Sequence, residues 1–370
     1  MIVILAPYNS KSLGTIEKIH LAIEALYKID KDILFIDTEF SKKSKKVCFS
    51  KITINNFNLN LLNLPFIYNK KLSTLNSFFR ISEIVNFIKH KGSPKLVWTY
   101  NLYALNVLLT KKIYKIFKCP CFLDFVDGIF ARPRLSNFVD YFMYLRTKKI
   151  FNLSFNANFK LKNDSDKISH KSIVFPSIIK KANFDFFKKK KIFNNKNKIT
   201  IGYFGSLVEE KGIDTIYNLI KVLPKKFNFI ICGKGKYKSK IINLKKKNNN
   251  VQYYYFKNIK NVNLKMSECD ILLNPHRVKI IDEIFPFKLV QYIVSRRLVI
   301  STKVNNSNLI NFTNGVHFVD DNFDSFYKAI LNHQKIYLLK KKNIFKNYLN
   351  WKKNYTLEDY SNLIAYNMNI

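Results

Sequence analysis

Residues 274–302 of the 370-residue chain read NPHRVKIIDEIFPFKLVQYIVSRRLVIST, and this stretch decides the predicted fold. An apolar run that ends at Leu273 predicts a buried strand, and a polar loop follows it. Pro286 then marks a first helical turn, where the missing N–H of proline costs nothing. Leu298 opens a second apolar run, so the order is strand, loop, helix and strand, as in a parallel α/β sheet. The helix positions predicted to face the core are Leu289, Tyr292 and Ile293.

The loop before this helix carries groups suited to a ligand with phosphate groups. Glu283 stands just before the helix N-terminus, where free backbone N–H groups and the helix dipole favour an anion such as a diphosphate. A carboxylate there can accept hydrogen bonds from sugar hydroxyl groups. Lys288 and Gln291 share one face of the helix. The pattern is compatible with a nucleotide diphosphate sugar, although an ordinary α/β connection has the same order of elements.

The rest of the chain alternates strands and helices in the same way. Before residue 180 we predict strands at residues 2–6, 33–36, 96–98 and 121–126. After residue 198 we predict strands at residues 199–204, 227–232, 251–256, 270–273, 298–301 and 316–319. Such alternation predicts an α/β protein of two doubly wound, Rossmann-like domains that face a cleft, with ligands at the carboxyl ends of the strands.

The predicted domain boundaries follow from shifts in composition. We expect an N-terminal domain at 1–178, a basic, Asn-rich linker at 179–198, a C-terminal domain at 199–340, and a helical tail at 341–370 that packs back toward the N-terminal domain. A solvated loop within one domain is the alternative interpretation of residues 179–198. The length of the chain agrees with two domains rather than one.

The charge of the chain is strongly positive, with a formal net charge of +39 and a pI of about 9.9. A charge of this size suggests a polyanionic partner such as nucleic acid. However, Lys, Asn, Ile, Phe and Tyr are abundant together, and these residues share A/T-rich codons, so biased coding explains the lysines equally well. The sequence contains neither a zinc finger nor an RNA-binding aromatic signature, so we expect no nucleic-acid partner.

Three further patterns limit the class of protein. No run of about 18 apolar residues predicts a membrane-spanning helix. The N-terminal sequence MIVILAPYNS lacks a basic region before its apolar run, so it is typical of a first strand and not of a signal peptide. The five cysteines are scattered and odd in number, which predicts reduced packing residues in a cytosolic protein.

Residues 283–301 resemble the donor-site motif of GT-B glycosyltransferases, in particular the large retaining family 4. That motif has two Glu residues with seven residues between them. Glu283 matches the first, and Gln291 stands where the second is expected. Phe287 and Lys288 lie in the matching centre of the motif. The resemblance implies that Glu283 binds hydroxyl groups of the donor sugar, that amides near Phe287 hold the diphosphate, and that Gln291 binds the ribose through its amide oxygen.

A second segment supports the first. Residues 201–207, followed by Lys211, resemble the opening of the family's C-terminal domain, where a strand ends at a glycine, here Gly205. The resemblance implies that Lys211 neutralises the leaving diphosphate, and Ser206 stands where an arginine is common. The glycine-rich turn at Gly233 resembles a strand end that lines the donor site. Without the family, Lys211 would be one more solvated lysine.

Four further residues are candidates for the site. His276 and Arg277 lie in the predicted donor loop and are candidates for contact with phosphate. Gly14 occupies the first β–α loop, where glycine lets a ligand approach the backbone. Asp127 follows a predicted strand where relatives carry His-Asp or Glu-Asp, so the resemblance makes it a candidate for orienting the donor or the acceptor hydroxyl. A helix or turn cap is the alternative interpretation of Asp127.

The resemblance also implies what the protein does. It predicts a cytoplasmic glycosyltransferase that moves a sugar, with retention of configuration, from a nucleotide diphosphate sugar to a saccharide or polyprenol-linked acceptor in bacterial surface polysaccharide synthesis. No Asp-x-Asp occurs at a predicted strand end, so we expect no metal and no other cofactor, with Lys211 and the helix N-terminus compensating the charge. A nucleotide-sugar 2-epimerase of the same fold and a basic nucleic-acid-binding protein are the alternatives.

Two groups of lysines are candidates for peripheral contact with anionic lipids on the cytoplasmic face of the inner membrane. The first group, within Lys42–Lys46, is Lys42, Lys43, Lys45 and Lys46, and the second is Lys111, Lys112, Lys115 and Lys118. Solvated lysines raised in number by coding bias are the alternative interpretation.

Overall fold

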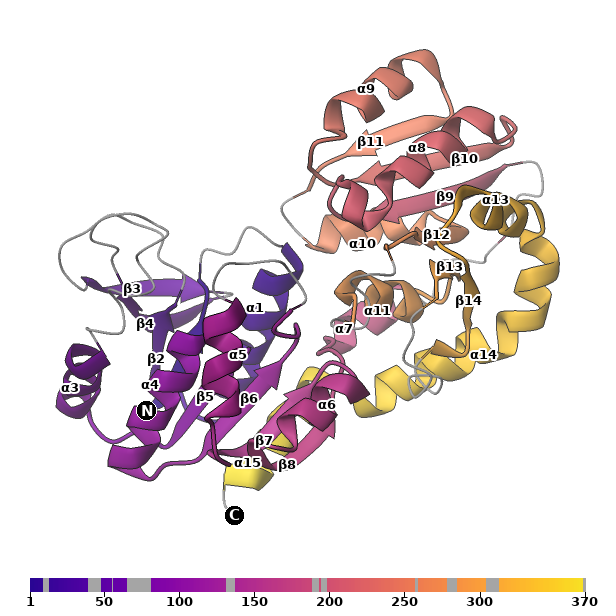
Figure 1. Cartoon of the computed structure of the whole chain (residues 1–370). Helices are drawn as coiled ribbons and strands as arrows, with labels where there is room; N and C mark the ends of the chain where they lie inside the picture. The colour runs from indigo at the N-terminus through magenta and orange to yellow at the C-terminus, as the bar shows by residue number, and fades with distance from the viewer. Residues whose placement is uncertain are drawn as a thin grey trace. The chain divides into compact units, whose positions relative to one another are not determined.

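The computed structural model divides the chain into two compact units (Figure 1). The N-terminal unit consists mainly of Met1–Ile178 and Leu357–Ile370, and the C-terminal unit mainly of Ile179–Asp282 and Pro286–Thr356. The residues that the structure describes are 1–8, 13–38, 48–54, 56–64, 81–130, 137–187, 193, 198–256, 259–277, 285–303 and 313–368. Each unit is an α/β domain built on a largely parallel sheet, which confirms the predicted fold class.

The described strands of the N-terminal unit form one sheet in the order β3-β4-β2-β1-β5-β6-β7-β8. Its first strand, β1, is buried along its whole length between β2 and β5, as the apolar run predicts. Every pair in the sheet is parallel except β3 with β4. The strands are β1 (Ile2–Ala6), β2 (Ile33–Asp37), β3 (Cys48–Ile54), β4 (Phe57–Asn63), β5 (Leu96–Tyr100), β6 (Cys121–Phe125), β7 (Phe151–Asn156) and β8 (Ser169–Val174).

Four of these strands, β3, β4, β7 and β8, were not among those predicted from the sequence. In β7 the reason is chemical, because buried polar side chains interrupt the apolar run. Ser154 Oγ lies 2.9 Å from Ser165 Oγ and donates to Ser172 Oγ at 2.8 Å, and Asn156 donates to the carbonyl of Ile173 at 3.0 Å. These hydrogen bonds satisfy the Ser154 hydroxyl and the side-chain N–H groups of Asn156, so the strand forms without a continuous apolar run.

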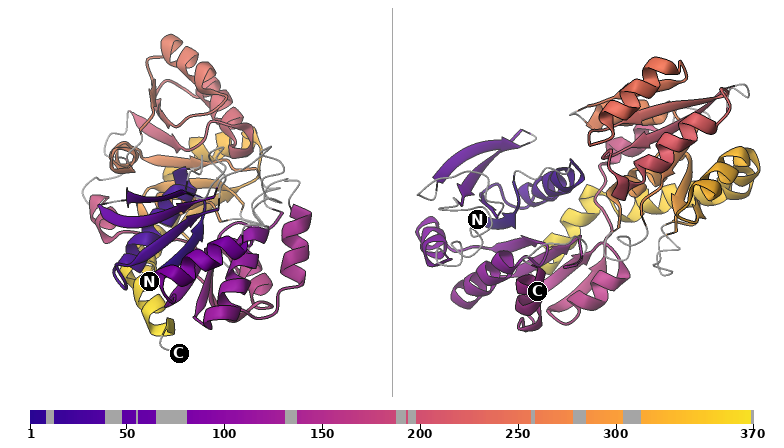
Figure 2. Two further views of the ribbon diagram at one scale, coloured as in Figure 1. Left: turned by 90° about the vertical axis from the view of Figure 1, so that its left-hand side faces the viewer. Right: turned by 45° about the horizontal axis from the view of Figure 1, so that its top comes forward.

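Helix α15 of the chain's C-terminal end belongs to the N-terminal unit and packs on α1 (Figures 1 and 2). Its Tyr360 hydroxyl accepts a hydrogen bond from Trp98 Nε1 at 2.9 Å and donates to Asp124 at 3.2 Å. Asp124 also forms a buried ion pair with Lys18, with the charged atoms 2.8 Å apart. The described helices of this unit are α1 (Leu13–Tyr27), α3 (Ile81–Lys91), α4 (Ala104–Phe117), α5 (Asn137–Leu145), α6 (Phe159–Ser165) and α15 (Leu357–Met368).

The described strands of the C-terminal unit form a parallel sheet in the order β11-β10-β9-β12-β13-β14. Numbered within the unit, this is 3-2-1-4-5-6, the order of dinucleotide-binding folds, in which ligands bind where the order reverses. That point lies between β9 and β12, at their carboxyl ends. The strands are β9 (Ile199–Phe204), β10 (Phe227–Cys232), β11 (Val251–Tyr254), β12 (Ile271–Asn274), β13 (Leu298–Thr302) and β14 (Val316–Val319).

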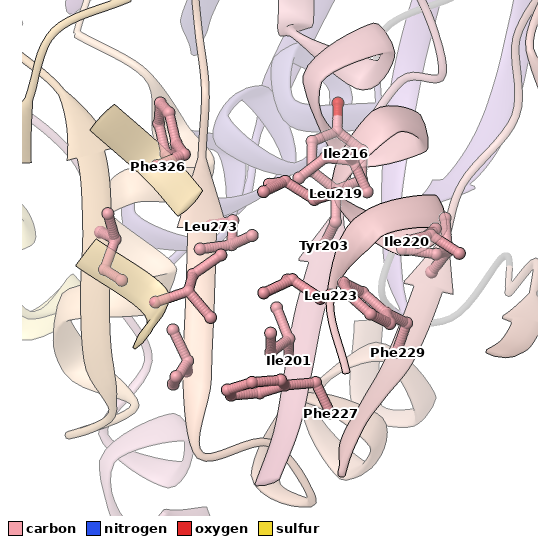
Figure 3. Packing of buried hydrophobic residues seen from close by; sticks show 14 of the residues in the cluster. Ile201, Tyr203, Ile216, Leu219, Ile220, Leu223, Phe227, Phe229, Leu273 and Phe326 are labelled. Atoms are coloured by element: carbon pink, nitrogen blue, oxygen red, sulfur yellow. The ribbon is translucent and has the colours of Figure 1, made fainter. Parts of the chain in front are cut away.

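One continuous core joins this sheet to the helices on one of its faces (Figure 3). Ile201 and Phe229 project from β9 and β10 toward Ile216 and Leu219 of α8, and Phe326 of α13 completes the cluster. The described helices of the unit are α7 (Lys181–Phe186), the 3-10 turn η1 (Glu209–Lys211), α8 (Ile213–Val222), α9 (Lys238–Lys247), α10 (Ile259–Ser267), α11 (Phe287–Val294), α13 (Phe323–Leu331) and α14 (His333–Asn354).

Two local predictions differ from the structure. The segment expected to be a linker, 179–198, contains α7, which contacts α10 within the C-terminal unit. Helix α11 begins at Phe287, with Pro286 as its N-cap residue rather than within its first turn. All five cysteines are free thiols; four are buried, as predicted for packing residues, whereas Cys48 is exposed. In the part of the chain that the structure describes, no helix is both long enough and apolar enough to cross a membrane.

Candidate functional site

Two glycine turns meet at the carboxyl edge of the C-terminal sheet. Strands β9 and β10 are neighbours, and the N–H of Gly205, just after β9, donates to the carbonyl of Cys232 at 2.9 Å. A Cβ atom added to Gly233 would lie 1.8 Å from the carbonyl oxygen of Gly205, so only glycine fits there. Ser206 follows as an exposed residue. The structure thus brings the predicted residues Gly205, Ser206 and Gly233 together.

Helix α11 places Lys288 against these turns. A Cβ atom added to Gly205 would lie 3.5 Å from Lys288 Cδ, and Lys288 Nζ lies 4.6 Å from the centre of the Tyr203 ring. The Nζ atom is buried and has no hydrogen-bond partner among the described residues. Burial, and secondarily the charge of Lys211, lowers the pKa of Lys288 well below its usual value. Among the described residues no side chain compensates the charge of this ammonium group by a hydrogen bond, and an anion placed beside it would stabilise it.

Lys211 lies in η1, close enough to influence Lys288. Its Nζ is 2.5 Å from Nε2 of His276, a fully buried residue of the loop after β12. The other ring nitrogen of His276, Nδ1, lies 3.3 Å from the carbonyl oxygen of Arg277. Because a carbonyl can only accept, we assign the proton to Nδ1, so that Nε2 accepts from the lysine. His276 therefore orients the Lys211 ammonium.

Gly212, directly after Lys211, fixes the turn that carries it. Its φ of 70° lies in the left-handed region, and an added Cβ would lie 1.7 Å from the carbonyl oxygen of Pro275. The hydroxyl of Tyr203 also donates to the carbonyls of Ser206, at 2.8 Å, and Lys211, at 3.3 Å. Tyr203 thus ties both ends of the β9–α8 connection together and presents its ring to Lys288.

Arg277 is held by carboxylates of its own unit. Its guanidinium forms ion pairs with Asp321, at 2.7 Å, and with Asp214 of α8. Burial alone would lower the pKa of Arg277, but the hydrogen bond to Asp321 and the charges of Asp214 and Asp321 raise it. With two carboxylates matching its charge, Arg277 braces the loop after β12.

Tyr292 is a residue whose role the sequence reading missed. Its hydroxyl accepts from the N–H of Phe204 at 2.7 Å and donates to the carbonyl of Phe204 at 3.1 Å. These bonds fasten α11 to the end of β9, directly before Gly205, and so set the position of Lys288. Gln291, the preceding residue, is half-buried on α11. In the sequence, the signal for this role of Tyr292 was a tyrosine on an otherwise aliphatic helix face.

The other predicted residues fall in three places. Glu283 lies outside the described residues, as does the Lys42–Lys46 group. Gly14 lies in the first turn of α1 in the N-terminal unit. Asp127, in the same unit, is half-buried, and its backbone N–H donates to Asn101 Oδ1 at 3.1 Å. Asn101, with a positive φ of 56°, also accepts from the N–H of Val126, and this clamp on the loop after β6 was not predicted.

The site of the C-terminal unit therefore has basic side chains, glycine turns and a helix N-terminus at the switch point of a doubly wound sheet. Residues 184–357 match the family Glycosyl transferases group 1. This range covers most of the C-terminal unit, which is therefore similar in sequence to the domains of this group. Among the described residues, no group of three or more His, Cys, Asp or Glu side chains is placed to hold a metal ion.

Solved structures resemble the whole chain. Sucrose-phosphate synthase from Thermosynechococcus elongatus superimposes with a TM-score of 0.71 at 11% identity, covering 99% of this chain and 97% of that one. HepE of Anabaena in complex with UDP gives 0.69 at 11%, covering 100% and 99%. The α,α-trehalose 6-phosphate synthase of Burkholderia multivorans gives 0.67 at 7%, covering 100% and 96%. These likenesses confirm the GT-B fold. No curated protein matches the chain in sequence.

Proposed function

We propose that this glycosyltransferase takes its sugar from a nucleotide diphosphate sugar that binds at the carboxyl edge of the C-terminal sheet. The observation that carries the proposal is the Lys288 ammonium, buried beside Gly205 without a hydrogen-bond partner among the described residues. Burying such a group costs free energy unless an anion meets it. The HepE structure holds UDP on the same fold, which supports a uridine nucleotide as the first donor to test.

The diphosphate would be bound by three kinds of donor. Lys288 and Lys211 supply two cations, and the first turn of α11 supplies backbone N–H groups that have no acceptor within the helix. Close packing at Gly205 and Gly233 brings the backbone of both turns to the same edge. Lys211 would turn from His276 toward the phosphate as the donor enters.

These groups also suit the chemistry of transfer. When the bond between the sugar and the phosphate breaks, negative charge grows on the departing diphosphate and positive charge on the sugar. Fixed cations beside the diphosphate stabilise that state more than the intact donor, which lowers the barrier. We further propose, from the resemblance to family 4, that configuration is retained. In the same scheme Glu283 holds the donor sugar, Gln291 the ribose, and Asp127 the donor or acceptor hydroxyl.

The acceptor we propose is a lipid-linked saccharide, as in the assembly of bacterial surface polysaccharides. The resemblance of residues 283–301 to the donor-site motif of family 4 suggests this class. The protein would then work at the cytoplasmic face of a membrane while its donor arrives from solution.

The experiment combines a donor screen with matched variants. The protein is heated with UDP, GDP and their common sugar conjugates, because a ligand that binds the native state raises the melting temperature. We expect a shift with one nucleotide series, its loss in Lys288→Met, and its retention in Lys246→Met, a control at an exposed lysine of α9. Released nucleotide and glycosylated product are then measured with a saccharide acceptor. An equal shift in Lys288→Met would contradict the site, and an epimerised sugar without transfer would contradict the reaction.

A further inference from the structure

Helix α5 of the N-terminal unit turns its apolar side chains outward. Phe138 is 79% exposed, Leu145 61% and Phe142 47%. These positions follow the spacing i, i+4 and i+7, so they share one face of the helix. The residues of α5 that are buried are polar instead: Asn137, Asp140 and Tyr144. A surface helix of a soluble domain has the opposite arrangement.

The polar inner face of α5 forms hydrogen bonds within the unit. Asp140 Oδ1 accepts from the N–H of Ala104 at 2.7 Å, which satisfies a free donor in the first turn of α4. The Tyr144 hydroxyl donates to the carbonyl of Asp164 at 3.0 Å. Helices α4 and α5 lie side by side in Figure 1 and are in contact. The fold is thus held by the polar side of α5, and this use of the helix leaves its aromatic side on the surface.

The outward side chains and a neighbouring aromatic residue form an exposed patch. Phe130, also exposed, has its ring centre 5.4 Å from that of Tyr141. The guanidinium of Arg146 lies 4.0 Å from the ring centre of Phe142, a cation–π contact at the edge of the patch. The members of the aromatic patch are Phe130, Phe138, Val139, Tyr141, Phe142 and Leu145. Exposed apolar surface of this extent marks an interaction site.

The rim of the aromatic patch is basic. Arg146, Lys148 and Lys149 follow α5 directly and are exposed. Lys111 of α4 reaches the end of α5, where its Nζ donates to the carbonyl of Arg146 at 3.0 Å, and Lys115 lies one turn farther along the same face. The acidic residue within α5, Asp140, is buried.

We propose that the aromatic patch inserts into the interfacial layer of an anionic lipid bilayer, with the basic rim at the lipid headgroups. Aromatic residues beside Lys and Arg are the composition that favours this layer. Anionic headgroups also match the charge of the rim. A second copy of the chain is a poor occupant, because a two-fold contact through the patch would bring the two basic rims together. The proposal does not depend on the sugar-transfer activity.

The test measures binding of the full chain to vesicles by co-sedimentation. Vesicles of phosphatidylcholine alone are compared with vesicles that also contain phosphatidylglycerol. We expect binding to the anionic vesicles, reduced at least about tenfold in Phe138→Ser/Phe142→Ser, because two aromatic rings no longer leave water. In Lys148→Gln/Lys149→Gln we expect roughly a fivefold loss per charge removed and a weaker dependence on salt.

The control variant is Leu338→Ser/Leu339→Ser on α14, where the two leucines are 62% and 71% exposed in the other unit. It removes comparable exposed apolar surface and should bind as the unmodified protein does. Equal loss in this control, or no binding of the unmodified protein to anionic vesicles, overturns the proposal. A change from dimer to monomer in Phe138→Ser/Phe142→Ser, measured by sedimentation velocity, would assign the patch to a second copy instead. A retained UDP-dependent melting shift in that variant separates this result from failure of the donor site.

Discussion

Replacing Lys288 by Met should stabilise the empty protein while it weakens donor binding. The Nζ atom is buried and without a hydrogen-bond partner among the described residues, and methionine fills a similar volume without a charge. An unsatisfied buried polar group costs about 1–3 kcal/mol. The contact of Nζ with the Tyr203 ring at 4.6 Å returns roughly 0.5–1 kcal/mol of this. We therefore expect Lys288→Met to raise the free energy of unfolding by up to about 2.5 kcal/mol.

Donor affinity should move in the other direction. A hydrogen bond to a charged group contributes about 1.5–3 kcal/mol, so the loss of one lysine–phosphate contact weakens binding roughly 10- to 150-fold. Stability is measured by urea unfolding, and affinity by calorimetry with the nucleotide found in the donor screen. Lys246→Met on α9 should change neither quantity, because the lysine is exposed. If Lys288→Met lost more than about 1 kcal/mol of stability and bound the donor normally, Lys288 would be a structural residue and the reasoning would fail.

The difference in unfolding free energy between Lys288→Met and the unmodified protein should also depend on pH. The folded-state pKa of Lys288 is depressed below the usual value of 10.5, so the unfolded chain binds more protons than the folded protein between those two values. Unfolding then becomes harder as pH rises through this window, in the unmodified protein but not in Lys288→Met. The advantage of the variant should accordingly shrink toward alkaline pH and be largest below the folded-state pKa.

Three further outcomes are expected. Donor binding should take up a proton, because a bound diphosphate raises the pKa of Lys288. Calorimetry in two buffers of different ionisation enthalpy measures this uptake. Donor affinity should also fall as pH rises above the pKa that Lys288 has in the ligand-free protein. Gly233→Ala should cost about 3 kcal/mol or more in urea unfolding, since its Cβ would lie 1.8 Å from the Gly205 oxygen. Tyr360→Phe should cost about 1–3 kcal/mol, because Trp98 Nε1 and Asp124 each lose a partner.

Each of these has an outcome that would contradict it. Identical heats in both buffers would mean that Lys288 is already charged in the empty site. A Gly233→Ala variant as stable as the unmodified protein would mean that the two turns are less closely packed than described. Tyr366→Phe, at an exposed tyrosine of the same helix as Tyr360, is the control for that site and should leave stability unchanged. Equal losses at Tyr360 and Tyr366 would contradict the hydrogen-bond account.

The sequence predicted the C-terminal unit better than the N-terminal unit for a physical reason. Strands β9 and β10 were predicted with their observed bounds, because each is a largely apolar run that ends directly before a glycine turn. In the N-terminal unit, β7 alternates polar and apolar residues although it is buried, because Ser154 and Asn156 find partners on β8 and α6. Such partners come from elsewhere in the chain, so local pattern cannot reveal them.

The candidate site shows the same limit. Lys211, Gly205 and Gly233 could be found from motif order, but the ion pairs of Arg277 with Asp214 and Asp321 join segments distant in sequence. The clamp of Asn101 on the loop before Asp127 depends on a single left-handed residue after a strand. The sequence shows the type of each side chain, but it does not show which distant residue that side chain contacts in the fold.

The net charge of +39 does not show which lysines bind a ligand, whereas the burial of each lysine does. Exposed lysines attract any anion weakly, because water and salt screen them. Lys288 differs because its charge is desolvated, so the empty protein bears a cost that only a well-placed anion removes. Most lysines supply a general positive field that raises the encounter rate with anionic donors and lipids. Selectivity for one ligand must come from the few lysines whose ammonium groups the fold has removed from water.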